Sequence, residues 1–154
     1  MLSLFEELLP SFNELMKKSH IIMIVDDDED DVELFCDALK EIDQEVQCIS
    51  ASNGEEALLK LNNDGSRLPD YIFLDLNMPR LNGKQCLKRL KISSRLRDIP
   101  VIIYTTSKLK EDVEETRQLG AVHFLTKPNR ANDLRKAIIS ILDGKYDKFE
   151  NVKM

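Results

Sequence analysis

The stretch Ile21-Ile22-Met23-Ile24-Val25 runs without a polar residue and ends directly on Asp26-Asp27. An apolar run this short has the length of a strand. A strand that is apolar on both faces must be covered on both faces, as the inner strands of a parallel sheet are. The stretch therefore predicts a buried strand that carries two acids at its carboxyl end.

Further short apolar runs follow along the chain, and amphipathic stretches separate them. These runs are Val46–Ala51, Tyr71–Leu74, Val101–Tyr104 and Ala121–Leu125. In the first amphipathic stretch the apolar residues recur at helical spacing, at Val32, Phe35, Leu39 and Ile42. Strands that alternate with helices in this way, five of each, predict an α/β fold with a parallel sheet and helices on both of its faces.

The composition of the runs indicates the order of the strands. Tyr71–Leu74 and Val101–Tyr104 are almost wholly apolar, like the first run, and so belong inside the sheet. The other two runs contain Gln47 and His123, which suit edge strands. Edge positions for the second and fifth strands fit the order 2-1-3-4-5 of the flavodoxin-like doubly wound fold.

Local signals mark the ends of the helices. Ser52-Asn53-Gly54-Glu55 predicts a capping box at the start of the second helix, and Leu119-Gly120 predicts the end of the fourth. The fourth helix, Lys110–Leu119, has few apolar positions and therefore little packing energy. We expect it to be the mobile element of a switch.

Composition narrows the class of protein. The chain has 154 residues, enough for one domain, and its net charge of −6 argues against a nucleic-acid partner. No apolar run approaches the roughly 18 residues that span a bilayer, and the acidic first residues do not fit a signal peptide. We therefore expect a cytoplasmic protein that does not contact a membrane. Its cysteines lie far apart without zinc spacing, so we expect reduced thiols at Cys36, Cys48 and Cys86.

Polar residues follow the predicted strands at one edge of the sheet: Asp26, Asp27, Asp75, Thr105 and Lys127. Ligands of this fold bind outside the carboxyl ends of the strands, so these side chains should converge. Three carboxylates repel one another unless a cation neutralises them, and oxygen ligands at an open site suit Mg²⁺. Asp75 is then the natural nucleophile toward a phosphoryl group, with Lys127 and Thr105 on the phosphoryl oxygens. The acids 28–31 are expected to stabilise a helix N-terminus instead.

Four motifs in this order resemble the receiver domain of two-component response regulators, over nearly all of Ile21–Leu142. The motifs are Ile-Met-Ile-Val-Asp26-Asp27-Asp-Glu-Asp, Leu74-Asp75-Leu-Asn77-Met-Pro79-Arg-Leu-Asn-Gly83, Thr105-Thr106-Ser107 and Lys127-Pro128. The resemblance implies the flavodoxin-like fold and a signalling protein rather than an enzyme.

The resemblance also assigns roles to single residues. It implies that Asp26 and Asp27 orient Mg²⁺ together with Asp75 and the backbone carbonyl of Asn77. It implies that Asp75 is phosphorylated, and that Thr105 and Lys127 contact the phosphoryl group as catalytic residues. Two further implications are a switch made of Thr105 and Phe124, and a cis peptide bond between Lys127 and Pro128.

Partners follow from the same resemblance. The donor would be a sensor histidine kinase or a phosphotransfer protein, and the receiver would act on a downstream protein target. The long segment before Asp70 resembles regulators associated with phytochrome-type kinases. A homodimer would form through the fourth helix, fifth strand and fifth helix. Residues 19–144 would be the receiver domain, and residues 145–154 a tail too short for an output domain.

Residues 1–18 lie outside the resemblance. Leu4, Phe5, Leu8 and Leu9 form an apolar face, which is read either as a dimer or partner contact or as a docked or disordered extension.

Two rival functions share parts of the same residue set. A haloacid-dehalogenase-like Mg²⁺-dependent phosphatase also uses a strand-end aspartate, but needs a general acid two residues later, where this chain has Asn77. An unphosphorylated receiver-like scaffold would act through partner binding alone, and the intact set of acids, hydroxyl and lysine argues against it.

Overall fold

The computed structural model describes residues 20–63 and 65–147. Its strands are β1 (Ile21–Val25), β2 (Gln47–Ala51), β3 (Tyr71–Leu74), β4 (Val101–Thr105) and β5 (His123–Thr126). Its helices are α2 (Glu29–Ile42), α3 (Gly54–Leu61), α4 (Gly83–Ile92), α5 (Lys110–Gln118) and α6 (Ala131–Leu142). The apolar face predicted in residues 1–18 lies outside the described residues, as does the end of the predicted tail.

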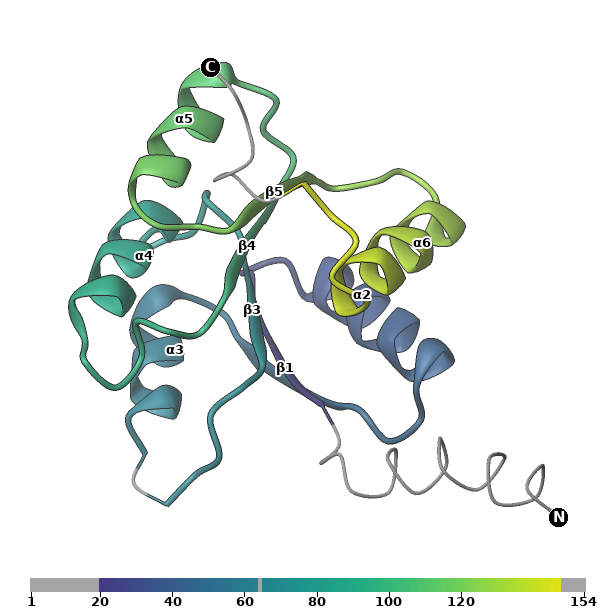
Figure 1. Ribbon diagram of the computed structural model, residues 1–154, viewed down its shortest axis with the longest axis horizontal. Helices are drawn as coiled ribbons and strands as arrows, with labels where there is room; N and C mark the ends of the chain where they lie inside the picture. Colours follow the sequence, from purple (N-terminus) through teal and green to yellow (C-terminus); the bar gives the residue numbers. More distant parts are fainter. Residues whose placement is uncertain (1–19, 64, 148–154) are drawn as a thin grey trace, which may run out of the picture.

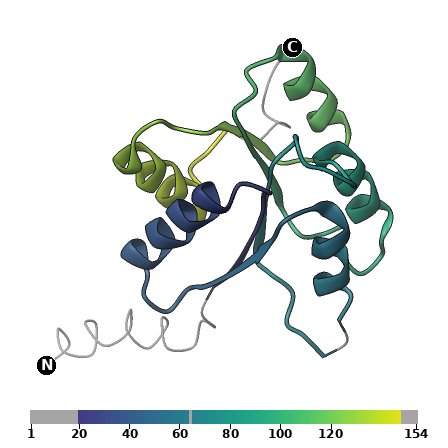
Figure 2. The same ribbon diagram turned by 180° about the vertical axis from the view of Figure 1, so that it is seen from behind.

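The strands form one parallel sheet in the order β2-β1-β3-β4-β5. Helices α2 and α6 cover one face of the sheet, and α3, α4 and α5 cover the other (Figures 1 and 2). The predicted flavodoxin-like α/β fold is therefore confirmed. None of the helices in the described ranges is long and apolar enough to cross a membrane.

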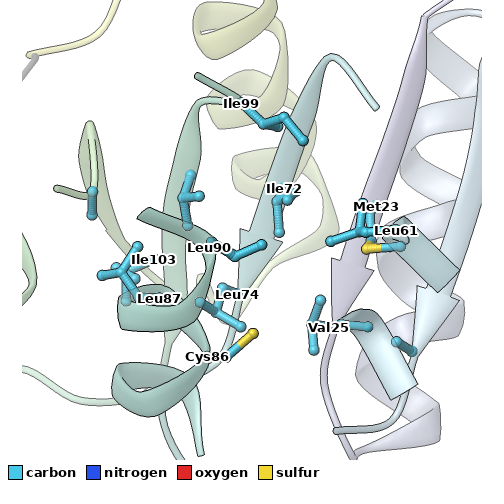
Figure 3. Close-up of a cluster of buried hydrophobic side chains, with 14 of the residues drawn as sticks. Met23, Val25, Leu61, Ile72, Leu74, Cys86, Leu87, Leu90, Ile99 and Ile103 are labelled. Carbon is cyan, nitrogen blue, oxygen red and sulfur yellow. The ribbon is translucent and has the colours of Figure 1, made fainter. Parts of the chain in front are cut away.

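Side chains of the inner strands alternate between two apolar clusters, one on each face of the sheet. Ile22 and Ile24 of β1 pack on the α2/α6 side with Phe35. Met23 and Val25 point to the opposite side (Figure 3), where Leu87 of α4 joins them. The edge strands β2 and β5 are less buried than these inner strands, as Gln47 and His123 led us to expect.

The start of α3 lies one residue later than the predicted capping box. Asn53 is the N-cap, and its side-chain oxygen accepts a hydrogen bond from the Glu56 backbone N–H at 2.9 Å. The Glu56 carboxylate, not that of Glu55, accepts from the Ser52 backbone N–H and hydroxyl at 3.0 and 2.6 Å. The prediction was wrong in register because Ser and Asn are both strong N-caps and stand side by side here.

Two of the cysteines form a disulfide, contrary to the expectation of reduced thiols. Cys36 of α2 and Cys48 of β2 are joined with their Cα atoms 5.8 Å apart, whereas Cys86 is free and buried. Their separation of 12 residues in sequence gave no sign of this contact. The return of the chain from α2 into the adjacent edge strand brings the two side chains together.

The predicted cis peptide bond before Pro128 is also corrected. Every peptide bond in the described part of the chain is trans. The trans form of an X–Pro bond is favoured by only about 0.5–1 kcal/mol, so the surrounding structure decides. Here the backbone N–H of Lys127 donates to the Thr105 carbonyl oxygen at 2.7 Å and continues the pairing of β5 with β4 up to the proline.

Candidate functional site

Three carboxylates meet at the carboxyl ends of the two central strands. Asp26 and Asp27 directly follow β1, and Asp75 directly follows β3. The two strands pair in parallel, and the Asp75 backbone N–H donates to the Val25 carbonyl oxygen at 2.9 Å. One oxygen from each carboxylate lies within 4.8 Å of the others. Because only oxygen ligands are offered, the cluster fits a hard divalent cation.

The three acids differ in exposure. Asp26 is 2% exposed and Asp75 is 6% exposed, whereas Asp27 lies at the surface. The cluster therefore has a buried floor and an open side, which leaves room for water or a further ligand on the cation.

Lys127 reaches into this cluster from the end of β5. Its ammonium donates to an Asp26 carboxylate oxygen at 2.6 Å and lies 3.8 Å from an Asp75 carboxylate oxygen. It also donates to Asp31 at 2.7 Å and lies 5.5 Å from the centre of the Tyr104 ring. The ammonium thus offsets part of the negative charge of the cluster.

Burial and pairing shift the ionisation of this pair. Burial is the largest influence on Asp26 and, with the nearby Asp75 charge, raises its pKa to about 6 despite the hydrogen bond from Lys127. Burial acts to lower the pKa of Lys127, but its hydrogen bonds to Asp26 and Asp31 outweigh this and raise it. Lys127 therefore stays positively charged near neutral pH. Within this ion pair it is Asp26 whose charge changes when the pH falls toward 6.

Asp31 is a further partner of Lys127 that the sequence did not reveal. Asp28 is the N-cap of α2, and Glu29, Asp30 and Asp31 occupy its first turn, as expected for acids at a helix N-terminus. Asp31 additionally pairs with Lys127, 96 residues away. The sequence does not distinguish Asp31 from its neighbours, because it stands in a run of six acids. Only the packing of α2 next to Lys127 identifies it.

Thr105 and Phe124 share one side of the sheet. Thr105 is fully buried at the end of β4, and its hydroxyl oxygen accepts from the Ser107 backbone N–H at 3.4 Å. Phe124 of β5 is half-buried and packs with the cluster under α3, α4 and α5. Strand alternation places Thr105 on this same side, because Ile103, which pairs with Phe124, belongs to that cluster as well.

The loop after Asp75 is held tightly to the start of α4. Asn77 is exposed in this loop, two residues beyond Asp75. A Cβ on Gly83 would lie 2.2 Å from the Asp75 carbonyl oxygen, so only glycine allows this approach. The Gly83 N–H donates to the Leu76 carbonyl oxygen at 3.1 Å, which closes the loop. The backbone that carries Asp75 is thereby fixed.

A five-stranded sheet of this order with acids, hydroxyl and lysine at its carboxyl edge defines a class of signalling domain. The sequence model of the response regulator receiver domain matches residues 22–139. The chain belongs to this family.

Relatives and solved structures agree with this assignment. The chain is 32% identical over 125 residues to "Response regulator Rcp1" of Synechocystis sp., covering 79% of this chain and 85% of Rcp1. The phosphorylated cyanobacterial phytochrome response regulator RcpA superposes with a TM-score of 0.75 at 26% identity, over 81% of this chain and 92% of RcpA. The Mn²⁺-bound form of Rcp1 superposes with a TM-score of 0.70 at 32% identity, over 79% of this chain and 91% of that one.

Proposed function

We propose that this chain is a response regulator that accepts a phosphoryl group on Asp75 in a reaction that requires Mg²⁺. The observation that carries the proposal is the convergence of Asp26, Asp27 and Lys127 around the carboxylate of Asp75. The Mn²⁺-bound form of Rcp1 and the phosphorylated form of RcpA, both similar to this chain, support it. We take residues 19–144 as the receiver domain.

The proposed reaction is phosphoryl transfer from a phosphohistidine. A carboxylate oxygen of Asp75 attacks the phosphorus, the new O–P bond forms as the N–P bond breaks, and the imidazole nitrogen keeps the electron pair. Asp26, Asp27, Asp75 and the Asn77 carbonyl would hold Mg²⁺, which when bound would supply positive charge for the phosphoryl oxygens. Lys127 supplies a further positive charge from the side of β5, and Thr105 supplies a hydroxyl from the end of β4.

Signal output would start at Thr105. Its hydroxyl now accepts from the Ser107 N–H, and the Ser107 hydroxyl donates to the Asp112 carboxylate of α5 at 2.5 Å. A move of the Thr105 hydroxyl toward a phosphoryl group would break the first of these contacts. We propose that this change, together with a new rotamer of Phe124, alters the α5–β5–α6 surface that binds a downstream protein or a second copy of the chain.

The phosphoryl donor is proposed to be a sensor histidine kinase of the phytochrome type, or a phosphotransfer protein. The likeness to Rcp1 and RcpA supports the phytochrome type, since RcpA is described as a phytochrome response regulator. A cytoplasmic location fits a donor of this kind.

Intact-mass measurement after incubation with acetyl phosphate and Mg²⁺ tests the proposal. We expect the wild type to gain the mass of one phosphoryl group, and to lose the gain when EDTA replaces Mg²⁺. Asp75→Asn should gain nothing, while the matched variant Asp37→Asn, which removes an exposed acid of α2, should behave as wild type. A phosphorylated Asp75→Asn protein, or an unmodified wild type, would contradict the assignment.

A further inference from the structure

The ammonium of Lys127 is divided among three acids. It lies 2.6 Å from Asp26 and 2.7 Å from Asp31, both within hydrogen-bond distance. Its separation from the nearest Asp75 oxygen is 3.8 Å, which is beyond the roughly 3.2 Å limit of a hydrogen bond to an ammonium. In this structure, therefore, the lysine is hydrogen-bonded to Asp26, which follows β1, and to Asp31 of α2, and it makes no hydrogen bond to Asp75.

Asp31 differs from the other two partners of Lys127. Its side chain is 32% exposed, whereas that of Asp26 is fully buried and that of Asp75 is 8% exposed. It stands in the first turn of α2 and lies outside the group of carboxylates that could hold a cation together. A substitution of Asp31 can thus change the contacts of Lys127 without removing a proposed cation ligand.

We propose that Asp31 is a positioning residue that restrains Lys127 and competes with a phosphoryl group on Asp75 for its ammonium. This inference rests on the proposed function. A phosphoryl group on Asp75 would bring anionic oxygens toward the face of Lys127 that is now without a hydrogen bond. The negative charge of Asp31 attracts the Lys127 ammonium toward α2. It therefore weakens the interaction of Lys127 with the phosphoryl oxygens.

The role is specific to position 31 within the acidic run. Asp30 precedes it in the same helical turn, is exposed, and makes no ion pair with Lys127 among the described residues. Both acids interact with the N-terminal end of the helix dipole. Asp30→Asn therefore changes the net charge and the helix dipole interaction as Asp31→Asn does, but leaves Lys127 bound as it is.

The test is the affinity for beryllofluoride, a stable mimic of a phosphoryl group on a carboxylate, measured by calorimetry in the presence of Mg²⁺. We expect Asp31→Asn to bind it about fivefold more tightly than wild type, which corresponds to the upper end of the energies of partly exposed ion pairs. Asp30→Asn and the conservative variant Asp31→Glu should stay within about twofold of wild type, which is below that size. The affinity for Mg²⁺ alone should not change in Asp31→Asn.

A double-mutant cycle separates the lysine from a general effect of charge. In a Lys127→Met background, Asp31→Asn should no longer change the affinity for beryllofluoride. A gain that persists in that background overturns the proposal, as does an Asp31→Asn protein that binds no more tightly than Asp30→Asn. If the wild type itself binds no beryllofluoride, or Asp75→Asn still does, the proposed function falls and this inference with it. If only the Asp31 comparison fails, the proposed function stands alone.

Discussion

Asp26 is buried beside a second carboxylate, and this local arrangement makes it sensitive to both protons and cations. Burial removes water from the charged carboxylate, and the hydrogen bond from Lys127 offsets this loss only in part. The pKa of Asp26 is therefore raised to about 6. The position of Asp26 at the strand end could be predicted from the apolar run before it. The sequence predicted that Asp26 and Lys127 lie close together at the strand ends, but not that they form an ion pair. The contact between Lys127 and Asp31 could not be predicted, because it depends on how α2 packs against the sheet.

The raised pKa of Asp26 predicts a pH dependence of stability in the metal-free protein. The folded protein holds this proton up to about pH 6, whereas the unfolded chain releases it near its ordinary pKa of 3.8. The contribution of Asp26 to stability is thus fully present below about pH 4 and is lost as pH rises through about 6, by about 3 kcal/mol in total.

The measurement is the free energy of unfolding by urea at a series of pH values in EDTA, for wild type and Asp26→Asn. Taking the difference between the two proteins removes the titration of those acids that do not interact with Asp26. The difference, wild type minus variant, should fall between about pH 4 and 7. A difference that stays constant, or rises with pH, would show that Asp26 is not buried as an unfavourable charge.

At the scale of elements, α5 stands out because few of its residues are buried and two of its acids form ion pairs with α4. Thr116 is its only buried residue, and no side chain caps its N-terminus. Lys84 of α4 compensates, since its ammonium lies 2.7 Å from both Asp112 and Glu115 of α5. Asp112 also accepts from Ser107, which connects the helix to the loop after Thr105. The small number of buried residues in this helix was predictable from its composition, but its ion pairs with α4 were not.

Removing the charge of Lys84 should loosen α5. In Lys84→Met we expect faster hydrogen exchange of the α5 backbone amides, with a loss of at most about 1 kcal/mol in global stability, because these ion pairs are partly solvent-exposed. The measurement is hydrogen exchange followed by mass spectrometry of peptides from residues 110–118. Lys88→Met is the matched control, because Lys88 is an exposed lysine one turn further along the same helix. Equal exchange in both variants would mean that the α4–α5 ion pairs do not restrain the helix.

At the scale of the whole molecule, the patterns of apolar and polar residues predicted the fold correctly, whereas several contacts between single residues were predicted wrongly. The apolar runs 21–25, 71–74 and 101–104 and the polar residues Gln47 and His123 indicated which strands lie inside the sheet and which at its edges, in agreement with the observed order. This was possible because a strand that is covered on both faces needs apolar residues on both faces, whatever its neighbours are. The capping box of α3, the peptide bond before Pro128 and the state of Cys36 and Cys48 were predicted wrongly. The last two depend on neighbours that only the folded chain supplies, whereas the capping box was wrong by one residue because Ser52 and Asn53, both strong N-caps, stand side by side.

The Cys36–Cys48 disulfide predicts how the whole molecule responds to reduction. The bond closes a loop between residues 12 apart in sequence and restricts the unfolded chain, which stabilises the folded state by about 3 kcal/mol for a loop of this size. A reductant such as TCEP should therefore lower the free energy of unfolding of the wild type by about that amount. The double variant Cys36→Ser/Cys48→Ser should be less stable from the start and should not respond to the reductant, since Cys86 is free in either case. Wild type that is equally stable with and without reductant would show that the two sulfurs are not bonded in solution, and the packing of α2 against β2 would then rest on the apolar cluster alone.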